Sequence, residues 1–402
     1  MAKVLLNALA STAGGGITYL RNVLPRLSEC DKVNHYFSLV PPEHLSNYSG
    51  FVNDRVNIES VKTGGGLIGR LLWEQTGLRN YIERRNIDVL VSVGNFALFQ
   101  SPVPQLLFIR NDLYFSDYFE NDLKARGLYS TLFNHKLKSW LARKSLKQAD
   151  INIAPTEAFT ERIRTSNGLG TIKLEVIHFG FDPHVFATNA EPLPAEQSAK
   201  LNLSNDCYRL LYVSHYNYFR NFETLIRALP LIKARIREKK GKEIRLVLTT
   251  DIRRGAIYGG YDATTAADLI DSLGVRDDIA MLGSVPYDKL HHVYRLCDLF
   301  VCPSYSESFG HPLLEAMASG LPLAAANLDV HREVCGDAAV YFDVFDHREL
   351  AEQCVRILTS GDLQQKLKDQ GLRRCRFFSW DDHVNTLVEL IDRTLKNNAT
   401  VI

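Results

Sequence analysis

The sequence has few of the features that distinguish membrane-spanning, nucleic-acid-binding or disulfide-stabilised proteins. Its 402 residues include 47 lysines and arginines against 46 aspartates and glutamates, so no strong overall field attracts a polyanion such as nucleic acid. No apolar run approaches the roughly 20 residues of a membrane-spanning helix. The seven cysteines are scattered and include no C-x-x-C pair, which disfavours a zinc site or a disulfide framework.

The N-terminus and the common catalytic signatures add further exclusions. The chain passes from Met1–Lys3 directly into a strand-like run, without the basic and apolar regions of a secretory signal. We therefore expect a cytoplasmic protein, with peripheral attachment to the inner face of the membrane left open. No Gly-x-Ser-x-Gly segment of a serine hydrolase occurs. A nicotinamide dehydrogenase is disfavoured because Gly14–Gly16, after the first strand-like run, lacks the dinucleotide-binding glycine spacing.

Short apolar runs alternate with helical stretches along both halves of the chain, as in parallel sheets wrapped by helices. In the first half these runs are Val4–Leu9, Tyr36–Val40, Val56–Val61, Val89–Val93, Leu106–Ile109, Ile151–Ala154 and Val176–Ile177. In the second half they are Leu210–Val213, Ile244–Leu248, Ile279–Leu282, Leu299–Cys302, Leu321–Ala326 and Ala339–Phe342. We therefore predict an α/β fold of two doubly wound Rossmann-like domains, with ligands at the carboxyl ends of the strands.

The alternation pauses over Asn189–Asp206, and we place the linker near 179–206. Residues 1–180 are predicted to form the N-terminal domain and residues 181–380 the C-terminal domain, each of a usual size for one core. A last helix over about 381–402 has one apolar face, formed by Val384, Leu387, Val388 and Ile391. This helix could pack on either domain, including back on the N-terminal one.

A short helix is predicted over 311–319, after the strand-like run that ends at Cys302. Pro312 suits a first helical turn, and Gly320 suits a helix end. The first amides of this helix, around 309–311, have no partner inside it and favour an anion such as a diphosphate. This stretch therefore predicts a phosphate cradle at the end of a strand.

Two carboxylates lie near this predicted phosphate site in the sequence. Glu307 precedes the helix and Glu315 lies about one turn inside it, so both could face one crevice and accept hydroxyl hydrogen bonds. Carboxylates beside a phosphate cradle suggest a sugar nucleotide as ligand. The alternative is a loop charge at Glu307 and a solvated helix residue at Glu315.

The segment also resembles the signature of a known enzyme family. Two glutamates separated by seven residues enclose Phe-Gly-x-Pro, and the second begins Glu-Ala-Met-Ala-x-Gly-x-Pro. This arrangement is similar to the motif of the family-4 retaining glycosyltransferases, or glycosyl transferase group 1. The resemblance implies the GT-B fold, in which two Rossmann-like domains face a central crevice. It also implies an acceptor-binding N-terminal domain and a nucleotide-sugar-binding C-terminal domain.

The resemblance continues along most of the chain in the family's order. The similar segments are Gly14–Gly16, Ala149–Glu157, Val176–Asp182, Leu211–Ser214, Arg220–Leu225, Leu282–Gly283, Ala325–Asn327 and Glu333. Two positions depart from the family pattern. Arg220 stands where members carry a lysine for the diphosphate, with no second cation identified. Asn111 and Asp112 stand near a position where many members carry a His-Asp pair, so no histidine role can be transferred.

The resemblance implies a role for each candidate residue. The catalytic candidates are Glu307 at the transferred sugar, Arg220 at the leaving diphosphate, and Asn111 or Asp112 beside the acceptor or the anomeric carbon. The donor-binding candidates are Glu315 at the ribose, together with Ser308, Phe309, Gly310, His311, Gly15, Gly16, Ser214 and Asn327. No two aspartates have Asp-x-Asp spacing, which disfavours the metal-dependent transferase fold. We therefore expect no metal and no cofactor.

These inferences predict a retaining, metal-independent hexosyltransferase. It would act on a saccharide acceptor, lipid-linked in our interpretation, in the biosynthesis of a cell-surface polysaccharide such as lipopolysaccharide. Two alternatives stay open, namely a sugar-nucleotide hydrolase or epimerase on the same fold, and a catalytically silent sugar-nucleotide-binding subunit. The sequence does not fix the donor base, the sugar, the acceptor or the linkage.

Two helical segments of the first half have further significance. Residues 124–147 contain seven lysines and arginines, three aromatic residues and no acidic residue, a composition that suits an anionic membrane surface or a diphosphate-linked lipid. The alternative is a solvated basic face with the aromatic side chains in the core. Trp73-Glu74-Gln75 is expected to be core with a polar edge, and it resembles a segment of polysaccharide-building members of the family.

Overall fold

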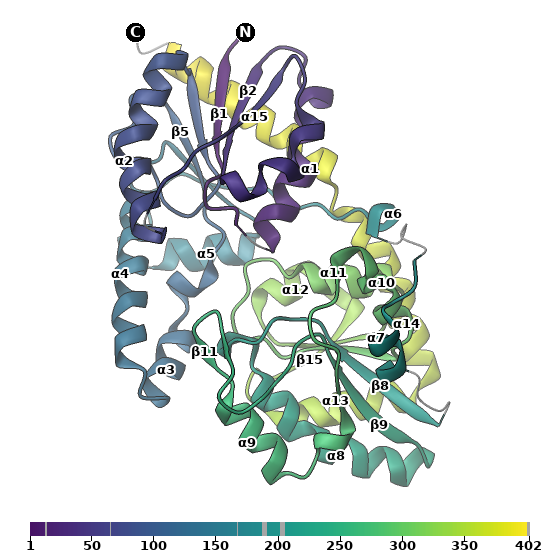
Figure 1. The fold of residues 1–402 in the computed structure, drawn as a ribbon. Coiled ribbons are helices and arrows are strands. Elements are labelled where there is room, and N and C mark those ends of the chain that lie inside the picture. The colour runs from purple at the N-terminus through teal and green to yellow at the C-terminus, as the bar shows by residue number, and fades with distance from the viewer. Residues whose placement is uncertain (13, 65, 167, 187–190, 202–205, 400–402) are drawn as a thin grey trace. The chain divides into compact units, whose positions relative to one another are not determined.

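The computed structural model describes residues 1–12, 14–64, 66–166, 168–186, 191–201 and 206–399. The chain divides into two compact units. The N-terminal unit comprises Met1–Ser116, Gly127–Gly180 and Phe378–Ile402, and the C-terminal unit comprises Asp117–Arg126 and Phe181–Phe377. Both are drawn in Figure 1. The predicted α/β architecture with two parallel sheets is confirmed.

The N-terminal unit is built on a parallel sheet of seven described strands, in the order β3-β2-β1-β4-β5-β6-β7. The strands are β1 (Lys3–Asn7), β2 (His35–Val40), β3 (Val56–Ser60), β4 (Val89–Ser92), β5 (Gln105–Phe108), β6 (Ile151–Ala154) and β7 (Leu174–Val176). The strand order changes direction between β1 and β4, and this switch point is where doubly wound sheets leave a crevice for ligands.

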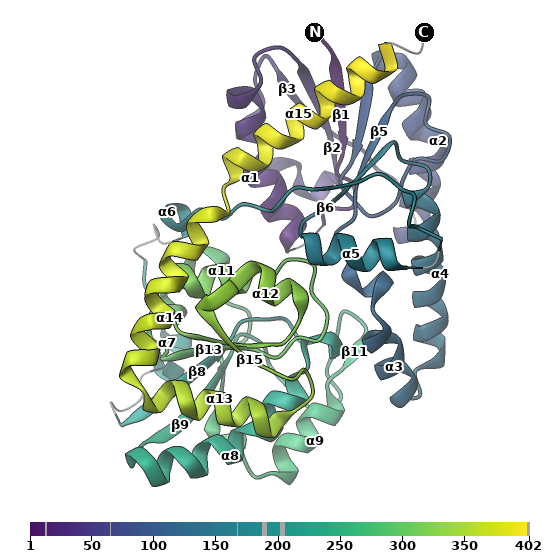
Figure 2. The same ribbon diagram turned by 180° about the vertical axis from the view of Figure 1, so that it is seen from behind.

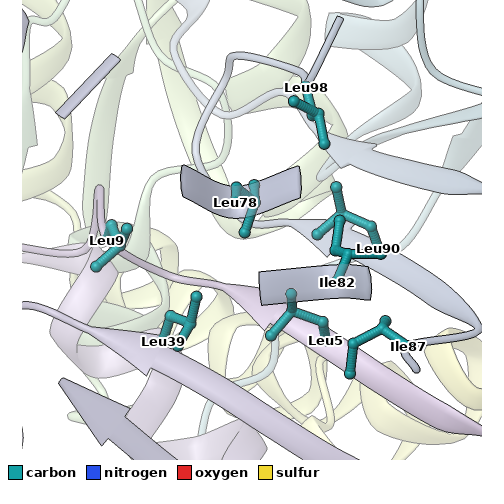
Figure 3. Close-up of a cluster of buried hydrophobic side chains, with 8 residues drawn as sticks. All are labelled: Leu5, Leu9, Leu39, Leu78, Ile82, Ile87, Leu90 and Leu98. Carbon is teal, nitrogen blue, oxygen red and sulfur yellow. The ribbon is translucent and has the colours of Figure 1, made fainter. Parts of the chain in front are cut away.

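Helices cover this sheet and bury its apolar side chains. They are α1 (Gly15–Cys30), α2 (Gly66–Arg85), α4 (Tyr129–Leu146), α5 (Glu157–Thr165) and α15 (Trp380–Ala399), with 3₁₀ turns η1 (Pro42–Asn47), η2 (Ser49–Phe51) and η3 (Asp112–Phe115). One core cluster joins Leu5 of β1, Leu39 of β2 and Leu90 of β4 to Leu78 and Ile82 of α2 (Figure 3). Burying each of these side chains stabilises the unit by about 1.5–3 kcal/mol.

The C-terminal helix α15 lies on the N-terminal unit, next to α1 (Figure 2). Asp381 accepts a hydrogen bond from Arg26 Nε at 2.7 Å, and His383 Nε2 lies 3.2 Å from the Tyr19 hydroxyl. A Cβ atom at Gly180 would lie 2.2 Å from the Trp380 amide nitrogen, so glycine is required where the helix begins. The sequence left open on which domain this helix packs, and in the structure it packs on the N-terminal unit.

The C-terminal unit contains a parallel sheet of six described strands, in the order β12-β9-β8-β13-β14-β15. The strands are β8 (Cys207–Tyr212), β9 (Glu243–Leu248), β12 (Ile279–Met281), β13 (Leu299–Cys302), β14 (Leu323–Ala326) and β15 (Ala339–Phe342), with a small hairpin of β10 (Ile257–Tyr258) and β11 (Tyr261–Asp262). Its helices are α6 (Pro183–Phe186), α7 (Ala195–Leu201), α8 (Phe222–Lys240), α9 (Thr264–Ser272), α10 (Leu290–Arg295), α11 (His311–Ala318), α12 (Asp329–Cys335), α13 (His347–Thr359) and α14 (Gly361–Arg374). Its 3₁₀ turns are η4 (Tyr218–Arg220), η5 (Arg276–Asp278), η6 (Tyr287–Lys289), η7 (Gly336–Ala338) and η8 (Cys375–Phe377). The switch point here lies between β8 and β13.

One helix of the range 1–180 belongs to the C-terminal unit. Helix α3 (Asp117–Ala125) and the Arg126 that follows it lie in this unit. Arg126 Nη2 pairs with Glu223 Oε1 at 3.0 Å, and Asp122 accepts a 2.7 Å hydrogen bond from the Tyr305 hydroxyl. The Arg126 guanidinium also lies 4.1 Å from the centroid of the Tyr218 ring. These partners are about a hundred or more residues away in the sequence, so local periodicity gives no sign of them.

Among the described helices, none is both long enough and apolar enough to cross a membrane.

Candidate active site

The site in the C-terminal unit is built around the start of α11. Helix α11 spans His311–Ala318, which confirms the short helix predicted after β13. Gly310 precedes it with φ +95°, and a Cβ there would lie 2.8 Å from Leu313 Cδ1, so glycine is needed for the sharp entry. Buried Leu313, Leu314 and Met317 fix the helix on the sheet. Its first amides therefore point out of the helix at the carboxyl edge of the sheet.

Glu307 and Arg220 meet at this edge. The Arg220 Nη1 donates to Glu307 Oε2, and the two side chains are 23% and 13% exposed. Burial lowers the pKa of Arg220, but the neighbouring carboxylate of Glu307 raises it further, so the net pKa is higher than usual. Arg220 Nε is buried and has no hydrogen-bond partner within the described part of the chain. The site thus holds a permanent cation with one unused donor.

The backbone around Arg220 is fixed by hydrogen bonds on both sides. The Tyr212 hydroxyl donates to the Arg220 carbonyl at 2.9 Å and lies 2.9 Å from Ser304 Oγ. Ser304 Oγ in turn accepts from Arg220 Nη1 at 3.4 Å. Asn221, in the left-handed region with φ 54°, donates through Nδ2 to the carbonyls of Pro303 and Val344. These contacts hold the guanidinium against the loop that carries Glu307.

Glu315 is buried, with 4% of the residue exposed. The Tyr294 hydroxyl donates to its Oε2 at 2.8 Å, whereas Oε1 makes no hydrogen bond within the described residues. Burial raises the pKa of Glu315 to about 7, although the hydrogen bond from Tyr294 opposes this shift. The alternative interpretation of Glu315 as a solvated helix residue is therefore wrong. Its partner Tyr294 lies on α10, where no motif identified it.

The remaining donor-binding candidates of this unit follow neighbouring strands. Ser214 comes after β8, Ser308 and His311 flank the turn after β13, and Asn327 comes after β14. Ser214 Oγ donates to the His215 carbonyl at 3.0 Å, and Asn327 Oδ1 accepts from Arg332 Nε at 2.5 Å. The carboxyl ends of parallel strands share one edge of the sheet, so these residues lie on the same edge as Glu307.

Phe309 differs from its neighbours in this turn. It is buried, with 1% of the residue exposed, and its ring centroid lies 5.1 Å from that of His311. The Phe309 side chain therefore packs into the unit.

The remaining candidates belong to the N-terminal unit. Gly15 begins α1, and its carbonyl accepts from Arg110 Nη2 at 2.9 Å. A Cβ at Gly16 would lie 2.9 Å from Ser11 Cα, so this glycine allows a close turn between β1 and α1. These two glycines are thus fixed at the carboxyl edge of the N-terminal sheet.

Asn111 and Asp112 form the start of η3. Asn111 Oδ1 accepts from the Leu113 amide at 3.2 Å, which caps the turn. The carboxylate of Asp112 is buried, and both of its oxygens lie 2.6 Å from Arg162 Nη1. Asp112 therefore anchors the turn to α5, whereas Asn111 is partly exposed.

No group of three histidine, cysteine, aspartate or glutamate side chains has the arrangement of a metal site among the residues that the structure describes. Sequence reasoning did not identify Tyr212, Tyr294 or Ser304, which support the site. Ser304 and Tyr294 lie 84 and 21 residues from Arg220 and Glu315, whereas Tyr212 lies only eight residues from Arg220. All three are of common residue types. Neither the motifs nor the periodicity of the sequence identified them.

Comparisons with known proteins bear on the family and the fold. Residues 195–374 match the family described as glycosyl transferases group 1. Over 249 residues, which are 60% of this chain and 54% of the other, the chain is 27% identical to D-inositol 3-phosphate glycosyltransferase of Thermobifida fusca. Over 194 residues, 48% and 47% of the two chains, it is 29% identical to O-antigen chain mannosyltransferase B of Escherichia coli. The chain thus matches about half the length of these relatives.

A solved structure extends the likeness of fold over nearly the whole chain. The Anabaena protein HepE, crystallised with UDP-glucose, superposes with a TM-score of 0.70 at 16% identity, covering 98% of this chain and 100% of that one. The resemblance noted in the sequence is therefore confirmed at the level of family and fold. Residues 195–374 belong to the glycosyl transferases group 1 family, and the chain has the two-domain α/β fold called GT-B.

Proposed function

We propose that the protein transfers a sugar, with retention of configuration and without a metal, from a nucleoside-diphosphate sugar to a saccharide acceptor. The observation that carries this proposal is the Arg220–Glu307 ion pair beside the N-terminus of α11. It brings together a cation, the first backbone amides of a helix and a carboxylate. A departing diphosphate needs the first two, and a sugar hydroxyl can bind the third.

Arg220 and the amides at 309–311 would stabilise the diphosphate as it leaves. Charge on the leaving oxygen grows as the glycosidic bond lengthens, so fixed donors lower the barrier more than they strengthen ground-state binding. The bond from the anomeric carbon to the diphosphate oxygen breaks and a bond to the acceptor oxygen forms on the same face. The acceptor proton passes to the departing diphosphate oxygen, so no protein base is required.

The ion pair also suggests how the site prepares for its donor. Without a ligand, Glu307 holds the Arg220 guanidinium in place and neutralises it. A diphosphate would replace the carboxylate as the partner of Arg220, using the Nε donor that has no partner among the described residues. Glu307 would then be free to accept hydrogen bonds from hydroxyls of the transferred sugar. Glu315 Oε1 would accept a ribose hydroxyl.

The acceptor is, in this proposal, a saccharide carried on a lipid, with the protein resting on the membrane surface. Support comes from α4, which exposes four large apolar side chains at Tyr129 (69%), Phe133 (70%), Leu137 (56%) and Trp140 (55%). Their spacing places them on one face of the helix. The alternative of a core position is therefore wrong for these aromatic side chains. These four side chains are called the α4 stripe below. Exposed Lys136, Lys138 and Lys144 flank the α4 stripe, and α4 contains no acidic residue.

Basic residues beside an aromatic stripe fit the anionic headgroups and interfacial region of a bilayer. The E. coli relative with O-antigen chain in its name is consistent with a role in cell-surface polysaccharide synthesis. A lipid-linked acceptor would be presented at that surface, and binding to the membrane there would account for the exposed apolar side chains of α4.

The experiment that tests the donor class is a thermal-shift titration with UDP, GDP and TDP. A ligand present at 100 times its dissociation constant should add about 2.7 kcal/mol of stability. Transfer from the corresponding labelled sugar nucleotide should then persist in EDTA. Release of free sugar without any acceptor product would favour the hydrolase alternative. Binding without turnover would favour a silent subunit.

A further inference from the structure

Helix α2 carries a carboxylate on the face that packs on the sheet. Glu74, Leu78 and Ile82 follow one another at intervals of four residues, which places them on one side of the helix. Leu78 and Ile82 are 0% and 2% exposed and point into the core cluster (Figure 3). Glu74 is also buried, at 7% exposure. A leucine there would extend the core, whereas a buried carboxylate costs free energy unless it is fully paired.

Glu74 is only partly paired in the structure. Asn7 Nδ2 donates to its Oε1 at 3.1 Å, and Arg70 Nε lies 3.9 Å from its Oε2. Arg70 Nε is buried and makes no hydrogen bond within the described residues. Burial raises the pKa of Glu74, although Arg70 and Asn7 oppose the shift. A carboxylate can accept about four hydrogen bonds, so both members of this pair have unused capacity.

The pair lies beside the switch point of the N-terminal sheet, where doubly wound sheets in general bind ligands. Asn7 is the last residue of β1 and therefore lies at the carboxyl end of the switch point between β1 and β4. The Arg70 side chain is 17% exposed, so the cluster is not sealed inside the unit.

We propose that Glu74, with Asn7 and Arg70, binds hydroxyl groups of the saccharide acceptor. This inference rests on the proposed function and specifies the acceptor site within it. The carboxylate accepts from two hydroxyls of one sugar ring, and Arg70 Nε and Asn7 donate to ring or hydroxyl oxygens. A carboxylate in this position disfavours an acidic sugar, so the ring bound here is uncharged.

The test compares Glu74→Gln and Glu74→Leu with Glu83→Gln, a control on the exposed face of the same helix. The probes are the methyl glycosides of glucose, galactose and mannose, observed by saturation-transfer NMR on the full chain. We expect binding of at least one probe to the wild-type protein and to Glu83→Gln, and binding weaker by about tenfold or more in both Glu74 variants. The unfolding temperature of Glu74→Leu should be equal to or higher than that of the wild type, because a leucine completes the apolar face.

Two results would overturn the inference. One is glycoside binding that is absent in the wild type or unchanged in Glu74→Leu. The other is a fall of several degrees in the unfolding temperature of both Glu74 variants, which would give Glu74 a structural role. A parallel titration with UDP, GDP and TDP separates this failure from failure of the proposed function, because those ligands test the C-terminal unit. Their binding should be the same in all four proteins.

Discussion

Arg220 and Glu307 lie 87 residues apart in the sequence and form a partly buried ion pair beside the first turn of α11. The pair joins a residue that follows β8 to one that follows β13, the two strands at the switch point of the C-terminal sheet. Each charge compensates the other, which avoids the cost of an unpaired buried charge.

Replacing Arg220 should slow transfer strongly. Arg220→Ala is expected to lower kcat by about 10²–10³, because charge on the leaving diphosphate grows toward the transition state. Arg220→Lys should recover part of the loss, since it restores the charge but not the planar fork. Steady-state kinetics with the identified donor measures this, with Arg227→Ala on the exposed side of α8 as the matched control. Rates within about twofold of wild type for Arg220→Ala would exclude Arg220 as the diphosphate partner.

Replacing Glu307 should separate turnover from nucleotide binding. Glu307→Ala is expected to reduce turnover by orders of magnitude, because the transferred sugar loses its hydroxyl acceptor. Binding of the free nucleoside diphosphate should be unchanged or tighter, since the carboxylate no longer competes for Arg220. Isothermal titration calorimetry beside the kinetics gives both values. If nucleotide binding weakened in step with turnover, Glu307 would contact the nucleotide part of the donor instead.

Glu315 should make stability depend on pH. Its pKa is raised by burial from 4.5 to about 7, so between these values the folded protein holds a proton that the unfolded chain releases. The free energy of unfolding should therefore fall as the pH rises from about 4.5 to 7, by about 3 kcal/mol from this group. Glu315→Gln cannot ionise and should lack this contribution.

The unfolding temperature of Glu315→Gln, relative to that of the wild type, should therefore rise between pH 5 and pH 8. A constant difference between the two proteins across this range would mean that the pKa of Glu315 is not raised. Glu315→Ala should weaken binding of the nucleoside diphosphate more than it slows turnover at saturating donor, because the ribose contact persists from ground state to transition state.

The α4 stripe should bind anionic bilayers. The wild-type protein is expected to float with vesicles that contain phosphatidylglycerol and to bind pure phosphatidylcholine weakly. Phe133→Ser with Trp140→Ser should abolish flotation, because the apolar insertion is lost. Lys136→Gln with Lys144→Gln should weaken binding by about 2 kcal/mol, or ~30-fold.

The matched control for this experiment is Ile257→Ser, which removes an apolar side chain that is 70% exposed in the C-terminal unit. It should leave flotation unchanged. Sedimentation velocity distinguishes the main competing occupant, a second copy of the chain. A dimer that dissociates in the Phe133→Ser, Trp140→Ser protein would assign the stripe to self-association.

The sequence by itself determined the two parallel sheets, the helix after β13 and the family of residues 195–374. Each of these is local information, because alternating apolar runs, a proline at a helix start and a glycine at its end report on neighbours in the chain. The motif around Glu307 and Glu315 could be recognised from the sequence for the same reason, because its residues lie close together in the chain.

The tertiary structure decided how charges are paired and which faces are buried. Arg220 lies against Glu307, Glu315 receives the Tyr294 hydroxyl, and Asp112 is held by Arg162. Periodicity shows that a helix has an apolar and a polar face. Which face is buried depends on the elements that pack against the helix in the folded protein. For that reason the aromatic side chains of α4 are exposed and the carboxylate of Glu74 is buried, each opposite to what its residue type favours.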